Sequence, residues 1–77
     1  MAPQIQFDGQ ASQAFTVGND RIYFVRADDD SPITVAHAST GEPYSRTNQY
    51  IRFSSKADAE TFLAMALLNG FMPYGYE

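Results

Sequence analysis

The stretch from Phe53 to Gly70, FSSKADAETFLAMALLNG, limits the possible folds most, because helix-boundary signals stand at both of its ends. Ser55 can cap the first turn of a helix with its hydroxyl, and Asp58 occupies the position of the reciprocal capping partner. Gly70 supplies the left-handed residue that ends many helices, and Pro73 prevents the helix from continuing. The sequence therefore predicts one helix that begins after Ser55 and ends at Gly70.

The apolar residues of this helix recur every 3.6 residues, which places them on one stripe that should pack against a sheet. The members of the stripe are Ala59, Phe62, Leu63, Ala66 and Leu67. Met65 and Leu68 project from the other side, where a surface helix is usually polar. Either the C-terminal tail folds over these two residues, or they form part of a surface that binds a partner.

Several segments before the helix have the composition or the alternation of β-strands. They are residues 4–7, 14–17, 21–26, 33–38 and 49–53. The third segment, RIYFVR, is the strongest, and the turn at residues 18–20 joins it to the second segment as a hairpin. Residues 8–9 are a further turn signal, so residues 1–12 form either a first hairpin or a loose arm. Residues 28–32 predict a loop, and residues 39–48 predict a long polar connection with a mobile tip.

Consecutive strands joined by short turns favour an antiparallel sheet, and a single helix covers one face of such a sheet. The predicted fold is therefore α+β: a small antiparallel sheet of four to five strands with one C-terminal helix packed on one face. Its 77 residues form a single domain. The strand residues expected on the inner face are Ile22, Phe24, Ile33, Val35, His37, Ile51 and Phe53.

The composition argues against several kinds of site. The chain has no cysteine and one histidine, so it has no disulfide framework and no thiolate metal site, and one imidazole is too few for most metal centres. No apolar run is long enough to span a membrane, and the N-terminus lacks the pattern of a signal peptide, so we expect a cytoplasmic protein. The net charge of −4 argues against general binding to duplex DNA or RNA, which requires lysine and arginine to neutralise phosphates.

No residue pattern in the chain predicts catalysis, and we expect neither an enzyme nor a bound cofactor. The adjacent carboxylates of Asp28, Asp29 and Asp30 lack the spacing, the turn glycine and the terminal glutamate of a calcium loop. They predict a solvated turn or, alternatively, an acidic patch that meets a basic surface on a partner. His37 falls on the inner side of its strand, where we expect a single histidine to be structural.

The outer face of the predicted sheet carries the most informative group of candidate binding residues. By alternation this face presents Arg21, Tyr23, Val25, Thr34, Tyr50 and Arg52. It is either an ordinary solvated face, a protein-binding face, or a platform on which single-stranded bases stack on Tyr23 and Tyr50. The C-terminal tail is a second candidate: either residues 71–72 seal the core, or Tyr74 and Tyr76 anchor a partner.

Together these features predict a non-catalytic protein-binding module, whose partner is another protein with, for example, a basic nucleic-acid-binding surface. In size and charge the chain is similar to small phage-encoded inhibitors, anti-CRISPR proteins among them, although this similarity covers no motif. It implies an inhibitor that binds and blocks a larger complex that handles nucleic acid. Two alternatives stay open. One is a single-stranded nucleic-acid binder. The other is a self-associating structural subunit or homodimer in which Met65, Leu68 and the tail form a symmetric interface.

Overall fold

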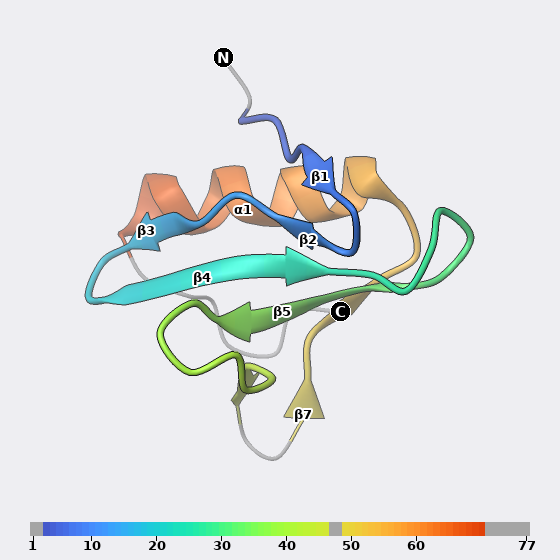
Figure 1. The fold of residues 1–77 in the computed structure, drawn as a ribbon. Coiled ribbons are helices and arrows are strands. Elements are labelled where there is room, and N and C mark those ends of the chain that lie inside the picture. The colour runs from blue at the N-terminus through green and yellow to red at the C-terminus, as the bar shows by residue number, and fades with distance from the viewer. Residues whose placement is uncertain (1–2, 47–48, 71–77) are drawn as a thin grey trace.

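The structure, a computed structural model, describes residues 3–46 and 49–70, without the side chains of residues 45, 46, 49 and 50. Figure 1 shows one helix lying along one side of a sheet. The elements in chain order are β1 (Phe7–Asp8), β2 (Ala11–Ser12), β3 (Phe15–Val17), β4 (Asp20–Val25), β5 (Ile33–His37), β6 (Ser45–Arg46), β7 (Gln49–Tyr50), β8 (Arg52–Phe53) and α1 (Lys56–Asn69).

The main sheet is antiparallel and has six strands. Its order is β1-β2-β4-β5-β8, and β3 also pairs with β4. Because Ala11 lies opposite Val25 and Phe15 lies opposite Ile22, β2 and β3 share one edge of β4. The arrangement confirms the α+β prediction, with one antiparallel sheet and a single C-terminal helix. The hairpin that joins residues 15–17 to the strongest strand is also present.

Side chains fill the break between β2 and β3. The hydroxyl of Ser12 accepts a hydrogen bond from the backbone N–H of Phe24 at 2.8 Å, so this donor keeps a partner where the backbone pairing of β2 with β4 ends. The side-chain amide of Gln13 accepts from the N–H of Gln6 and donates to the carbonyl of Gln4, both at 3.0 Å. Gln13 thereby takes the place of a neighbouring strand for residues 4–6.

Of the two possibilities for the N-terminal residues, the structure shows the hairpin. β1 and β2 pair as Phe7 with Ser12 and Asp8 with Ala11. Ile5 is fully buried, and its N–H donates to the carboxylate of Glu60 on α1 at 2.8 Å. The strand expected over residues 4–7 is shorter, because side chains rather than another strand hold residues 4–6.

The helix has the predicted boundaries. The Ser55 hydroxyl accepts from the N–H of Asp58 at 3.2 Å, and Gly70 ends the helix at φ 80° with its N–H bonded to the Ala66 carbonyl. Its buried residues are Ala59, Phe62, Leu63 and Ala66. The prediction that Leu67 belongs to the buried stripe is wrong, since its side chain is 42% exposed. At 100° per residue Leu67 lies about 90° from the centre of the stripe, at its edge.

The expected polar connection over residues 39–48 is instead partly built into the fold. Tyr44 is buried, its N–H donates to the Val35 carbonyl at 2.8 Å, and its hydroxyl donates to the Asp20 carboxylate at 3.0 Å. The physical reason is that β8 pairs with β5 only at residues 33–34. The backbone groups of the later residues of β5 therefore need other hydrogen-bond partners. Tyr44 and a bridge between Pro43 and Ala36 supply them.

The strand expected over residues 49–53 is divided at Ile51. β7 pairs with β6 in a separate two-stranded ribbon, whereas β8 pairs with β5 in the main sheet. Ile51 and Phe53 are buried, as the alternation predicted. The division moves Tyr50 out of the main sheet.

Candidate protein-binding face

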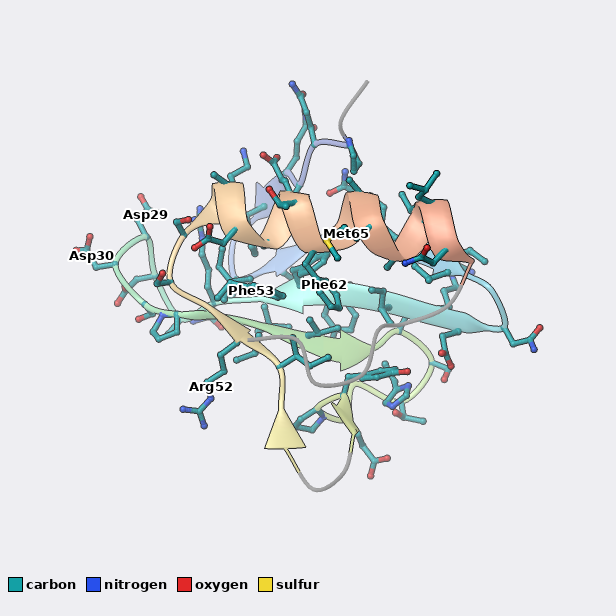
Figure 2. All side chains as sticks on the ribbon, turned by 180° about the vertical axis from the view of Figure 1, so that it is seen from behind. Asp29, Asp30, Arg52, Phe53, Phe62 and Met65 are labelled. Atoms are coloured by element: carbon teal, nitrogen blue, oxygen red, sulfur yellow. The ribbon has the colours of Figure 1, made fainter. Side chains whose placement is uncertain are left out.

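The face of the main sheet opposite α1 carries three of the predicted binding residues, Arg21, Tyr23 and Arg52, and we call it the open face. It is defined here by Arg21, Tyr23, Val25, Thr34 and Arg52. Cross-strand pairing places them together, because Val25 lies opposite Thr34 and Thr34 lies opposite Arg52. In Figure 2, Arg52 points away from the helix, whereas the next residue, Phe53, packs against Phe62 with ring centroids 5.0 Å apart.

Tyr23 is fixed at the centre of this face. It lies opposite Ala36 on β5, and its hydroxyl is 3.7 Å from the position that a Cβ atom would occupy on Gly41. Ala36 lies on the outer side of the sheet between Tyr23 and Pro43, and it is only 4% exposed. The backbone of Gly41 has φ 76°, a left-handed conformation that favours glycine at this contact.

The two arginines of the open face lie at opposite ends of it. Arg21 stands near the start of β4. Arg52 lies on β8, beyond β5, and is level with Val25 at the end of β4, which is four residues or about 13 Å along the strand from Arg21. Both side chains are exposed. Neither forms an ion pair within residues 3–46 and 49–70. Both charges are therefore available to a partner.

The other predicted contact residues are placed differently. Tyr50 belongs to β7 in the separate ribbon, so the prediction that it shares a strand with Arg52 is wrong. The physical reason is the break at Ile51 described above. The side chain of Tyr50 lies outside the description, as do Tyr74, Tyr76 and the rest of the tail.

The loop with three aspartates is ordered by its own hydrogen bonds. The carboxylate of Asp28 accepts from the hydroxyl of Ser31 and from the N–H of Asp30, both at 2.9 Å. These bonds, the one from Ser31 first, lower the pKa of Asp28 because they favour its ionised form. Asp29 pairs with Arg26 at 3.2 Å, and the Arg26 guanidinium lies 4.0 Å from the centre of the Phe7 ring.

Asp30 differs from its two neighbours in the loop. It is exposed, and among the described side chains it has no ion-pair partner. The described residues also contain no group of three histidine, cysteine, aspartate or glutamate side chains placed to hold a metal ion. Of the three aspartates, Asp30 is thus the one whose carboxylate is left for an external contact.

His37 and Tyr44 form a packed pair at the other end of the sheet. Their ring centroids are 4.6 Å apart, and His37 is half-buried. Tyr44 in turn bonds to Asp20 at the start of β4. The contact supports the expectation that His37 is structural, because its ring packs against an element of the core.

Three large apolar side chains are exposed on the C-terminal half of α1. Met65 is 41% exposed, Leu67 42% and Leu68 87%. The sequence pattern singled out Met65 and Leu68 but missed Leu67, because periodicity alone does not show where the sheet stops covering the helix.

No model of a known protein family matches the chain, and no curated protein or solved structure is significantly similar to it. The helix in the described part of the chain is too short and too polar to cross a membrane.

Proposed function

We propose that this protein is a non-catalytic protein-binding module and that its contact surface is the open face. The observation that carries the proposal is the combination of Arg21, Tyr23 and Arg52 on one rigid sheet surface. Tyrosine and arginine are enriched at the energetically dominant positions of interfaces, where they combine apolar area with hydrogen bonding. Since Tyr23 is half-buried and its hydroxyl lies beside Gly41, less side-chain entropy is lost when a partner covers it than for a fully exposed side chain.

Charge supports a further step in this proposal, namely that the partner carries a basic surface that meets the acidic loop beside the open face, away from Arg21 and Arg52. The net charge of −4 and the exposed carboxylate of Asp30 would steer the protein towards such a surface. A basic groove that binds nucleic acid is one surface of this kind. The corresponding role is a small inhibitor of the type that phages encode, anti-CRISPR proteins included, which blocks a larger complex by occupying it.

An affinity pull-down from native lysate, performed at low and at high salt with mass spectrometry of the retained proteins, tests this function. We expect a stoichiometric partner with a nucleic-acid-binding groove, whose retention weakens at high salt. The variants Tyr23→Ala and Arg52→Ala should release the partner. Lys56→Ala is the matched control, because Lys56 is an exposed cation on the helix side of the molecule. A partner that is retained equally by all variants contradicts the proposed face.

The exposed apolar side chains of α1 favour self-association as a second candidate function. Met65 and Leu68, which lie about 60° apart around the helix, would pair with the same residues of a second copy around a two-fold axis. Light scattering coupled to size-exclusion chromatography should then show a dimer, which Leu68→Glu converts to a monomer. A monomer for the unmodified chain at high concentration counts against this candidate.

A titration with oligothymidylate at low salt tests the third possibility, single-strand binding by Tyr23.

A further inference from the structure

A shallow groove of about 350 Å³ lies at the end of the open face that adjoins the acidic loop. Its lining includes Val25 and Thr34 from the sheet, Ser31 and Pro32 from the loop, and Arg52 from β8. The Thr34 hydroxyl donates to the Val25 carbonyl at 3.3 Å, so Thr34 offers the groove mainly its methyl group. The floor is therefore largely apolar, and it is large enough for one aliphatic side chain.

The loop wall of this groove is fixed before any partner arrives. Asp28 bonds to the Ser31 hydroxyl and to the Asp30 N–H, and the Ser31 N–H donates back to the Asp28 carbonyl at 3.2 Å. Arg26 and Asp29 add an ion pair at the base of the loop. A preformed wall lowers the entropy that binding must overcome.

Two charges of opposite sign, Arg52 in the lining and Asp30 at the tip of the loop beyond it, are not neutralised within the described part of the chain. Arg26 contributes to the lining, but its guanidinium is already engaged by Asp29 and the Phe7 ring. Arg52 and Asp30 are exposed and form no ion pair with the described side chains. Figure 2 shows Asp30 at the tip of the loop and Arg52 on the neighbouring strand, at the same end of the molecule.

We propose that this groove binds one aliphatic side chain of a partner protein segment that has a carboxylate on one side and a cation on the other. The carboxylate faces Arg52 and the cation faces Asp30. This inference rests on the protein-binding function proposed above and specifies the chemistry of the contact. A nucleic-acid strand fits less well, because its successive phosphates would approach Asp29 and Asp30 as well as Arg52.

A titration of the ¹⁵N-labelled full chain with short blocked peptides tests the groove directly. The probes are Gly-Glu-Leu-Lys-Gly, the reversed order Gly-Lys-Leu-Glu-Gly, and the neutral Gly-Gln-Leu-Gln-Gly, with oligothymidylate as the nucleic-acid probe. We expect one charged peptide to shift the amides of Val25, Thr34 and Arg52 with a Kd of about 1 mM. The neutral peptide should bind about fivefold more weakly, the size of effect that an exposed ion pair produces.

Two kinds of charge variant provide the test and its control. Arg52→Gln should weaken the charged peptide towards the affinity of the neutral one, and Arg52→Glu should weaken it at least as much. Lys56→Glu should leave binding unchanged, since Lys56 is an exposed cation on α1, on the other side of the sheet. Equal affinities for charged and neutral peptides, shifts away from the groove, or stronger shifts with oligothymidylate would overturn the proposal.

The same variants separate this proposal from the broader one. If a partner captured in the pull-down is released by Tyr23→Ala but not by Arg52→Glu, the groove is not its contact and the protein-binding function still stands. If the charged peptide binds the groove but no partner is retained, the groove chemistry holds and the proposed function fails.

Discussion

At the scale of single residues, Ser12 shows how one hydroxyl can replace a missing step of a β-ladder. The bond from the Phe24 N–H to the Ser12 hydroxyl lies in the gap between β2 and β3, where no backbone acceptor is opposite. A partly buried N–H without a partner is costly, so the sheet tolerates this gap only because a side chain fills it.

Ser12→Ala should therefore destabilise the fold by about 1–3 kcal/mol, the cost of an unsatisfied buried donor. Urea unfolding followed by circular dichroism measures the difference. Ser39→Ala is the matched control, because Ser39 is an exposed turn residue, and we expect it to change the free energy of unfolding very little. Equal effects of the two substitutions would show that the Ser12 bond contributes nothing.

A second residue-scale prediction concerns the loop. Ser31→Ala should raise the pKa of Asp28 towards its ordinary value, because the bond from Ser31 is the largest cause of the lowered pKa. Since the folded pKa lies below the unfolded one, the contribution of Asp28 to stability is present above the unfolded value. It is lost as the pH falls through the folded pKa. A ¹³C NMR titration of the Asp28 carboxyl carbon checks the shift, and an unchanged titration in the variant contradicts it.

At the scale of elements, the boundaries of the helix depend largely on its own residues, whereas the sheet decides which of its apolar side chains are buried. The caps at Ser55 and Gly70 need only neighbouring backbone groups. Leu63 and Leu67 belong to the same predicted stripe, yet Leu63 is fully buried and Leu67 is 42% exposed. The helix thus contacts a narrower surface than its pattern of apolar residues indicates.

Leu63→Ala and Leu67→Ala make identical chemical changes and should have unequal effects. We expect a loss of about 2–5 kcal/mol for Leu63, from the lost burial and the cavity that remains. For Leu67 we expect less than about 1 kcal/mol, because much of its side chain is already in water. Thermal or urea unfolding of both variants gives the comparison. Similar losses would mean that Leu67 is buried in solution, for instance in a dimer.

At the scale of the whole molecule, the N-terminal segment packs against the C-terminal helix α1. Ile5 is fully buried and bonds to Glu60, 55 residues later in the chain. Gln13 holds the neighbouring residues through two further bonds. These three bonds all use side chains, so the N-terminal segment is attached by few groups and should open before the sheet does.

Gln13→Ala should accordingly speed hydrogen exchange at the Gln6 amide by up to about tenfold, the equivalent of one typical hydrogen bond. Exchange at the amides that pair β4 with β5 should not change, because global stability is little affected. Gln6→Ala is the control, since only the backbone of Gln6 takes part in the contact. An unchanged rate at Gln6 in the Gln13 variant would show that the amide contact does not hold this segment in solution.

Part of the candidate site could be predicted from the sequence and part could not. Alternation within β4 placed Arg21, Tyr23 and Val25 on one face, because side-chain direction in a strand depends only on position. Tyr50 could not be assigned in the same way, since the break at Ile51 comes from competition between two pairing partners. The groove beside Arg52 could not be predicted from the sequence either, because the residues that line it come from segments that meet only in the folded protein.

Four features could be predicted without the tertiary structure: the helix with its two caps, the β3–β4 hairpin, the α+β class, and the inner and outer residues of the longer strands. All of these follow from interactions between residues close in the chain or from the period of apolar residues. Only the tertiary structure shows that Tyr44 enters the core, that Leu67 stays exposed and that Ile5 bonds to α1. Each of these outcomes depends on which backbone groups and apolar surfaces remain unpaired once distant segments have met.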